Sequence, residues 1–392
     1  MSAATPHLPL PDLAAQFLLR EGMTFLNHGS FGACPAPVFA VYQQWQRELE
    51  YQPVEFLGRR IPGLLAEARA ALATYVGAES PDDLAFVPNA THAINIVARS
   101  LELQPGDELL ATNHEYGAVD RTWRFVCAQR GARYLRQPIA LPLSDPTDVI
   151  EQLWAGVTPR TKVIIVSHIT SPTALTFPVA AICARAREAG IISVIDGAHA
   201  PGQIPLDLAA IGADFYAGNC HKWLCAPKGS AFLYARRERQ PLLQPLIVSW
   251  GWEAIQPGPS PFVDHFGWTG TFDPAAYLSV PAAIAFQAEQ HWDSVRAACH
   301  ALLVEARDQV AALFDLPQIC PASPEWFSQL AVAPLPPCDT VALQRRLWAE
   351  QRIEIPIIQW EDRAFARIAI QAYNTPDDVA QLVDALRRSM AR

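Results

Sequence analysis

Three lysines occur in the chain, at positions 162, 222 and 228, and one of them lies in a segment dense in reactive side chains. Lys222 belongs to Gly218-Asn219-Cys220-His221-Lys222-Trp223, about one strand–helix unit after Asp196. The apolar run at 191–195 predicts that Asp196 stands at the end of a buried strand. Pyridoxal phosphate needs a lysine amine to bond with its aldehyde and a carboxylate to keep its ring nitrogen protonated. The pair therefore predicts a site for this cofactor.

The segment at 88–95 predicts a phosphate site. Its small and polar residues, Thr91 among them, lead directly into a helical pattern. The first turn of a helix offers free N–H groups and a partial positive charge, which favour a bound anion. Asn and Thr are also common N-cap residues, so the segment alone is more typical of an ordinary helix start. The presence of Asp196 and Lys222 in the same chain favours the interpretation as a phosphate site.

Two further segments could contact the cofactor ring. Asn113-His114-Glu115-Tyr116 follows a predicted strand and offers planar side chains for stacking, although a loop aromatic can equally pack on a core. His199, three residues after Asp196, could donate to the phenolic oxygen, whereas a lone histidine is more often a satisfied core residue. Lys222 must spend time as a free amine to act as nucleophile and base, and burial would lower its pKa accordingly.

The elements that must position these residues alternate along the chain. Fully apolar strands separated by helices are typical of a parallel sheet that is covered on both faces. Ligands of such sheets bind beyond the carboxyl ends of the strands, where Asp196 is expected. The patterns predict helices at 35–50, 64–75, 119–130, 179–189 and within 276–314, and strands at 108–111, 163–167, 191–195 and 231–234.

The length of 392 residues exceeds one typical core and predicts one large and one small domain. We expect a large domain over 21–270, a small one over 271–392, and an N-terminal segment, 1–20, that packs on the small domain. The proline-rich stretch at 256–262 is typical of a lid or boundary loop.

Composition narrows the class of protein. The net charge of −9 argues against a nucleic-acid partner, and no apolar run approaches the ~18 residues of a membrane span or forms a signal peptide. A cytoplasmic protein is the default expectation. The eight cysteines form no Cys-x-x-Cys pair and the ten histidines are dispersed, so neither disulfides nor a metal site is expected.

Four segments carry a family resemblance: 25–32, 196–199, 218–229 and 368–374. Together they resemble the class V aminotransferases among the fold-type I pyridoxal-phosphate enzymes, and within them the isopenicillin N epimerase-like branch, which is related to cysteine desulfurases and carbon–sulfur lyases. The resemblance runs from about 24 to 390. It implies a large domain whose mostly parallel seven-stranded sheet lies between helices, and a smaller C-terminal α/β domain.

The same resemblance implies roles for residues that would hold the cofactor. Lys222 would form the covalent bond, Asp196 would pair with the ring nitrogen, and His199 would contact the phenolic oxygen. Tyr116 would stack on the ring. The residues that would contact the phosphate are Ala90, Thr91, Asn219 and His221, joined by Gly270 and Thr271 from the neighbouring subunit of a homodimer with active sites at its interface.

For the substrate, the resemblance implies that Arg367 clamps an α-carboxylate, which suits a guanidinium because it can donate two parallel hydrogen bonds. Asn27 and His28 would approach the substrate side. The stretch at 352–367 lacks the cysteine that desulfurases carry there, which argues against persulfide formation.

Several reactions share a first step, in which Lys222 removes the α-proton of an amino acid. An epimerase is the preferred interpretation, and its second proton donor could be His28 or Tyr116. A carbon–sulfur lyase acting on cysteine derivatives and a true aminotransferase remain alternatives, as does a relative without activity. No Gly-x-Gly-x-x-Gly follows a strand and no Gly-x-Ser-x-Gly occurs at 29–32, which disfavours a nicotinamide dehydrogenase and a hydrolase.

Overall fold

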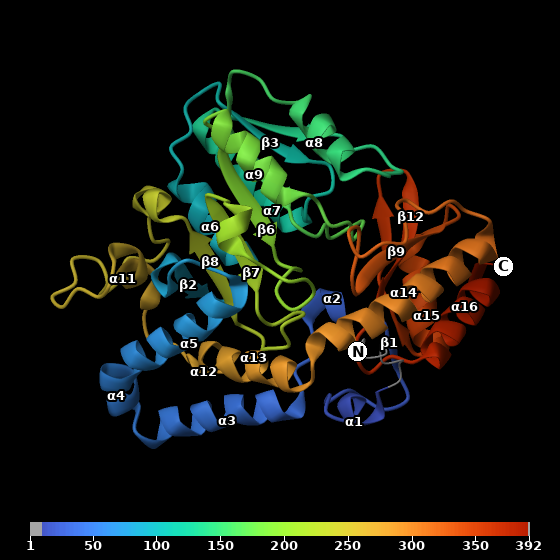
Figure 1. Ribbon diagram of the computed structural model, residues 1–392, viewed down its shortest axis with the longest axis horizontal. Helices are drawn as coiled ribbons and strands as arrows, with labels where there is room; N and C mark the ends of the chain where they lie inside the picture. The colour runs from blue at the N-terminus through green and yellow to red at the C-terminus, as the bar shows by residue number, and fades with distance from the viewer. Residues whose placement is uncertain (1–9, 391–392) are drawn as a thin grey trace, which may run out of the picture.

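The computed structural model describes residues 10–390, and residues 1–9 of the expected N-terminal segment lie outside them. A large body built on one seven-stranded sheet lies beside a smaller body formed by the C-terminal segment (Figure 1). The strands of the large sheet run in the order β2-β8-β7-β6-β5-β3-β4. Their bounds are β2 Leu84–Val87, β3 Glu108–Thr112, β4 Arg133–Gln137, β5 Thr161–Ser167, β6 Ile192–Gly197, β7 Phe215–Asn219 and β8 Ala231–Ala235.

The strands from β7 to β4 are parallel to one another, whereas β8 is antiparallel to both β7 and β2. The sheet is buried on both faces. Val163 and Ile165 of β5 belong to one hydrophobic core, and Ile164 and Val166 belong to the other, because successive side chains of a strand point to opposite faces. This arrangement confirms the predicted mostly parallel sheet between helices.

Helices connect the parallel strands. Helix α6 packs against α7, β7 and β8 on one face of the sheet, and α9 packs against β6. Their bounds, with those of the other helices between β2 and β8, are α6 Ala90–Ser100, α7 Gly117–Arg130, α8 Pro146–Trp154, α9 Val179–Glu188 and α10 Leu208–Ile211.

A helical layer lies along one end of the large body in Figure 1. In it α12 and α13 pack on α3 and α5, so the chain after residue 271 still contacts the large body. The predicted domain limits at 20/21 and 270/271 stay a prediction. The bounds are α2 His28–Phe31, α3 Ala36–Tyr51, α4 Pro53–Glu55, α5 Ile61–Val76, α11 Pro261–Gly267, α12 Ala275–Leu278 and α13 Val280–Glu289.

The smaller body is an antiparallel sheet, in the order β11-β12-β9, packed against helices. The N-terminal part of the chain reaches this body, because β1 pairs in parallel with β10. The bounds are α1 Pro11–Ala14, β1 Thr24–Phe25, α14 Trp292–Phe314, β9 Leu330–Leu335, α15 Thr340–Gln351, β10 Ile353–Glu354, β11 Ile357–Trp360, β12 Arg363–Ala369 and α16 Pro376–Met390.

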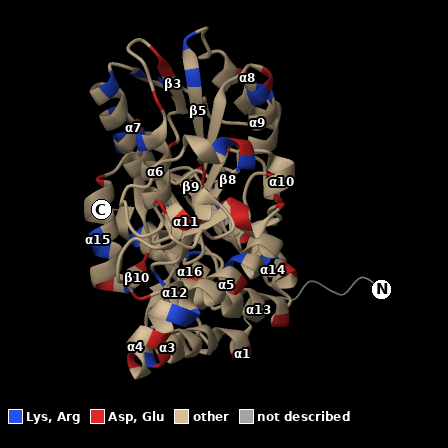
Figure 2. Ribbon diagram, turned by 90° about the vertical axis from the view of Figure 1, so that its left-hand side faces the viewer, with Lys and Arg blue, Asp and Glu red and all other residues tan. Residues whose placement is uncertain are grey.

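Charged residues lie mainly on the outer helices and loops, with basic and acidic side chains interspersed in the view of Figure 2. None of the helices within residues 10–390 combines the length and the apolar character that crossing a bilayer requires.

Candidate active site

One cavity of about 410 Å³ brings together most of the predicted site residues. It lies beyond the carboxyl ends of β5, β6 and β7, which end at Ser167, Gly197 and Asn219. Because these strands are parallel, their carboxyl ends meet at one edge of the sheet. The predicted residues that line it are Ala90, Thr91, Tyr116, Asp196, His199, Asn219, His221 and Lys222.

Asp196 provides a buried carboxylate in the cavity wall. Its backbone lies in register with Ser167 of β5 and Ala217 of β7. Its Oδ1 accepts a hydrogen bond of 3.0 Å from the Ala198 N–H. Burial raises the pKa of Asp196, and the Ala198 N–H and the nearby Lys222 amine oppose that rise. A cation that approached this carboxylate would stabilise its ionised form further.

Lys222 presents its amine next to a histidine ring. Its Nζ lies 3.1 Å from Nε2 of His199, and Nε1 of Trp223 donates to Nδ1 of the same ring at 3.2 Å. Burial lowers the pKa of Lys222 to about 8, with a smaller contribution from the Arg367 cation, while Asp196 acts in the opposite direction. Part of the Lys222 population is therefore a free amine near neutral pH, as a nucleophile or base requires.

Two glycines pack closely against the backbone around Lys222. A Cβ atom on Gly32 would stand 2.1 Å from the carbonyl oxygen of His221, and one on Gly202 would stand 2.3 Å from the backbone nitrogen of Leu224. Both glycines have positive φ angles, of 72° and 88°. Only glycine fits this close approach without strain, so the 25–32 segment has a structural reason for its glycine at position 32.

His28 lies under the lysine segment and not in the cavity. Its side chain is 0% exposed, with Nε2 at 3.1 Å from the carbonyl oxygen of Lys222 and Nδ1 at 3.0 Å from the hydroxyl of Tyr373. Burial lowers its pKa to about 3. Because both ring nitrogens are engaged by protein, the structure does not place His28 where it was expected, on the substrate side.

Helix α6 points its first turn into the cavity. The side chain of Asn89 caps the helix by accepting from the His92 N–H at 2.9 Å. The Ala90 N–H donates to Oδ1 of Asn219 at 2.8 Å, which ties the helix start to the end of β7. His221 is held through Nδ1, 2.9 Å from the carbonyl oxygen of Ser230, and burial lowers its pKa to about 4.

Arg367 projects from β12 toward the cavity wall. Its Nη1 donates to the carbonyl oxygen and the hydroxyl of Ser171 at 2.7 and 3.2 Å, and its Nη2 donates to the Ser30 hydroxyl at 3.2 Å. Its Nε–H is buried and has no partner within the described residues. Burial lowers the pKa of Arg367 to about 10, so the guanidinium is still charged at neutral pH.

Asn27 is linked to the Arg367 guanidinium through the Ser30 hydroxyl. The Ser30 hydroxyl donates to Oδ1 of Asn27 at 2.6 Å, and Nδ2 of Asn27 donates to Glu354 at 3.1 Å. A chain of hydrogen bonds thus runs from the Glu354 carboxylate to Arg367. Ser30 and Ser171 line the cavity, whereas Asn27 does not. The expected direct approach of Asn27 to the substrate side is not seen.

Glu115 was not singled out from the sequence, although it directly precedes Tyr116. Its two carboxylate oxygens accept from the hydroxyls of Thr112 and Ser167, each at 2.6 Å. Burial raises its pKa to about 7, and the negative charge of Asp196 adds to the rise. A second acidic group therefore lies close behind the cavity, on the side of Asp196.

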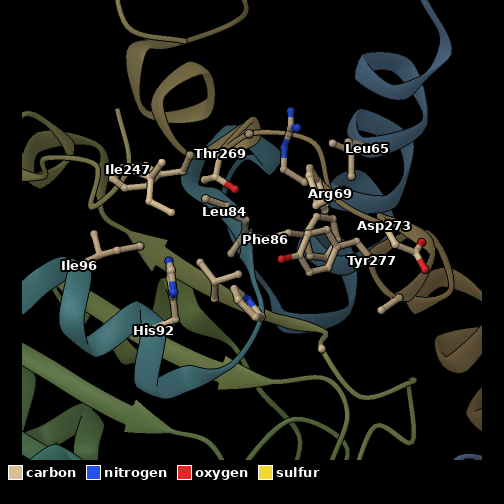
Figure 3. A pocket seen from close by; sticks show the side chains of 18 of the residues that line it. Leu65, Arg69, Leu84, Phe86, His92, Ile96, Ile247, Thr269, Asp273 and Tyr277 are labelled. Carbon is tan, nitrogen blue, oxygen red and sulfur yellow. The ribbon is translucent and has the colours of Figure 1, made fainter. Parts of the chain in front are cut away.

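Gly270 and Thr271 lie outside this cavity. They follow Thr269, which lines a second hollow of about 410 Å³ (Figure 3). This hollow is mainly apolar, with Leu84 and Phe86 of β2 in its wall. Within one chain, the two residues therefore make no contribution to the site around Lys222.

Comparison with known proteins identifies the family. A family model described as aminotransferase class-V matches residues 35–324, which is well over half of the chain. The chain belongs to the class V aminotransferase family. The isopenicillin N epimerase of Amycolatopsis lactamdurans is 37% identical over 386 residues, covering 95% of this chain and 96% of that protein. The resemblance seen in the sequence is confirmed.

More distant relatives extend the comparison. The putative L-cysteine desulfhydrase 1 of Oryza sativa subsp. japonica is 29% identical, with 97% of this chain and 86% of that protein covered. The solved cysteine desulfurase CsdA of Escherichia coli superposes with a TM-score of 0.81 at 22% identity, covering 98% of this chain and 99% of that one. A C-DES mutant with glycine covalently linked to its PLP cofactor gives 0.79 at 22% identity, with 97% and 98% covered. These structures confirm the predicted fold-type I architecture.

Proposed function

We propose that this chain binds pyridoxal phosphate in the cavity around Lys222 and acts at the α-carbon of an amino acid, as an epimerase. The observation that carries the proposal is the convergence of three groups on one cavity: the Lys222 amine, the buried Asp196 carboxylate and the first turn of α6. These are the amine, the anion and the phosphate cradle that the cofactor requires. Membership of the class V family supports this fit.

When bound, the cofactor supplies an aldehyde that captures amines and a ring that withdraws electrons from the α-carbon. Asp196 would hold a proton on the ring nitrogen, since a buried carboxylate gains most from a cationic partner. Lys222 would bond to the aldehyde and, once released, accept the α-proton at Nζ. Its lowered pKa, about 8, makes both tasks possible near neutral pH.

The phosphate would lie at the start of α6, against the N–H and the hydroxyl of Thr91, because the Ala90 and His92 N–H groups already donate to Asn219 and Asn89. Asn219 would orient the turn through its bond to the Ala90 N–H. His221 donates its Nδ1–H to the Ser230 carbonyl oxygen. Its Nε2 can therefore donate to phosphate only when the ring is cationic, with a proton on both nitrogens. A bound dianion would raise the pKa of His221 and favour that form.

Arg367 would bind the α-carboxylate of the substrate. Its Nε–H lies on the same guanidinium edge as Nη2, and that edge can present two donors side by side to a carboxylate. The buried, unpartnered Nε–H supports a ligand at this point, because such a donor is costly to leave unsatisfied. Ser30 and Ser171 would keep the guanidinium in its plane.

The choice of epimerisation rests on the relative that is 37% identical over almost the whole chain. A carbon–sulfur lyase acting on cysteine derivatives is the second candidate, favoured by the desulfhydrase relative and compatible with a stretch at 352–367 without cysteine. An aminotransferase would use the same Lys222 and Asp196. These reactions differ in the fate of the electrons after the α-proton has left.

We also propose that two copies of the chain pair across the face that bears the hollow of Figure 3. Seven large apolar side chains between 242 and 255 are exposed, which is an unusual concentration for a lone surface. This apolar segment consists of Leu242, Leu246, Ile247, Val248, Trp250, Trp252 and Ile255. In such a dimer, Gly270 and Thr271 of one copy would approach the phosphate of the other.

The decisive experiment combines attachment and turnover. Borohydride reduction followed by peptide mapping should place the cofactor on Lys222, in wild type and in a Lys162→Ala control, and label on Lys162 or Lys228 would refute the assignment. An amino-acid panel in deuterated water then separates the reactions. Deuterium at the α-carbon with inversion means epimerase, pyruvate with released sulfide or thiol means lyase, and a requirement for a keto acid means aminotransferase.

A further inference from the structure

Trp223, the residue after Lys222, is fully buried and makes a single side-chain hydrogen bond within the described residues. Its Nε1–H donates to Nδ1 of His199 at 3.2 Å. An indole N–H can only donate, so Nδ1 of His199 must carry no proton when this bond is made. Burial, together with the nearby Lys222 and Arg367 cations, lowers the pKa of His199 well below its usual range. The ring is therefore neutral, with its one proton on Nε2.

The position of this proton determines whether His199 offers a hydrogen-bond donor or an acceptor to Lys222. Nε2 lies 3.1 Å from Nζ of Lys222. An ammonium has three donors and no acceptor, so it cannot accept a hydrogen bond from Nε2–H. A free amine can. The Nε2–H form of His199 is thus compatible with a neutral Lys222 and unfavourable to a charged one. Two other groups also act on Lys222: Asp196 favours its charged form and Arg367 disfavours it.

The two rings are held in place by their surroundings. A Cβ atom on Gly29 would contact the rings of both Trp223 and His199, at 3.3 and 3.6 Å, so the 25–32 segment packs closely over them. Gln287 donates to the Trp223 carbonyl at 2.7 Å, and Gln203 donates to the His199 carbonyl at 2.8 Å. The two glutamines thus hold the backbones of Trp223 and His199, and the packing of Gly29 limits the space in which either ring could turn.

We propose that Trp223 is a positioning residue that fixes His199 in the Nε2–H tautomer and so aims one N–H donor at the reacting end of Lys222. The alternative Nδ1–H tautomer would set two donors against each other and leave Nε2 as an acceptor, which would stabilise a charged lysine. The importance of this donor for turnover rests on the proposed function, whereas the tautomer itself does not.

Nitrogen-15 NMR of the full-length protein labelled at histidine tests the tautomer directly. We expect His199, assigned by the loss of its signals in His199→Gln, to show a protonated Nε2 and a bare Nδ1. In Trp223→Phe the ring is kept and the donor removed, and Nδ1 should become protonated in a measurable fraction of molecules. Trp123→Phe is the matched control, since Trp123 is also fully buried and its Nε1 has no partner.

A protonated Nδ1 in the wild type would overturn the proposal, even if Trp223→Phe failed to fold. An unchanged tautomer in a folded Trp223→Phe would overturn it as well. In the cofactor-loaded enzyme, Trp223→Phe should lower kcat by roughly 10-fold with little change in KM, and should shift the pH dependence of turnover. Failure of the proposed function would show instead as an absence of label on Lys222, with the histidine spectra unaffected.

Discussion

The Nη1 atom of Arg367 donates a hydrogen bond of 2.7 Å to the carbonyl oxygen of Ser171, which joins the small sheet to the loop after β5. A substrate carboxylate that bound to this guanidinium would therefore lie where the two bodies of the protein meet. The Ser30 hydroxyl accepts a hydrogen bond from Nη2 of Arg367 and donates one to Asn27, which in turn donates to Glu354. The position of Arg367 depends on segments that are distant in sequence.

Arg367→Lys should keep a positive charge and lose the paired donors, because an ammonium is a point charge without a planar fork. We expect KM for amino-acid substrates to rise by roughly 10- to 100-fold, equivalent to about 1.4 to 3 kcal/mol of lost binding. The measurement is steady-state kinetics with an amino acid and its α-amide. Wild type should prefer the acid, and equal preference for both would argue against the clamp.

Asn219→Ala should weaken cofactor binding. It removes the oxygen that orients the Ala90 N–H at the start of α6, at a cost of about 1 kcal/mol or a few-fold to 10-fold in affinity. Titration of the cofactor by absorbance measures this. Asp145→Ala is the control, because Asp145 caps α8 by accepting from the Thr147 N–H at 2.8 Å, away from the cavity. Equal cofactor affinity in the two variants would contradict the phosphate cradle.

Gly32→Ala should destabilise the protein and disturb the lysine segment. The added Cβ would stand 2.1 Å from the His221 carbonyl oxygen, at a positive φ angle. We expect a loss of at least about 2 kcal/mol in the free energy of unfolding, measured by denaturant titration. Gly63→Ala in α5 is the matched control, since its Cβ meets nothing within 4 Å, and it should be neutral or slightly stabilising.

Glu115→Gln should change how stability depends on pH. The folded pKa of Glu115, about 7, lies above its ordinary value of 4.5, so the folded state binds the proton more tightly and the wild type loses stability as pH rises between these values. The variant lacks this loss, so its free energy of unfolding should increase relative to that of the wild type between pH 4.5 and 7, by at most about 3.4 kcal/mol. A difference in unfolding free energy that does not change with pH would contradict this account.

Trp250→Glu should disrupt the proposed dimer. Trp250 is 79% exposed in the single chain and belongs to the apolar segment at 242–255, so a buried charge there would oppose association. Sedimentation should show a dimer for wild type and a mainly monomeric variant. Val341→Glu, a change at another exposed apolar residue on α15, should leave the dimer intact. A monomeric wild type would refute the pairing.

Four of the five inner strands of the large sheet could be predicted from the sequence, whereas the edge strands β2 and β4 could not. β5 and β6 read as continuous apolar runs because both of their faces are covered. β4 is an edge strand whose Arg133 and Arg136 are exposed, so no apolar run marks it. β7 is not predicted from the sequence, because its apolar run is only three residues long and is followed by Gly218 and Asn219 of the lysine segment.

The sequence by itself determined most of the polar side chains that meet in the cavity. Asp196 and His199 lie at the end of β6, and Asn219, His221 and Lys222 lie at the end of β7. Parallel strands must bring such ends together. Only the tertiary structure decided the places of His28, Asn27 and Arg367. Sequence likeness put the first two on the substrate side, whereas packing put His28 under the Lys222 backbone and Asn27 behind Ser30. Contacts between distant segments depend on how the two bodies pack, and no local pattern of residues encodes that.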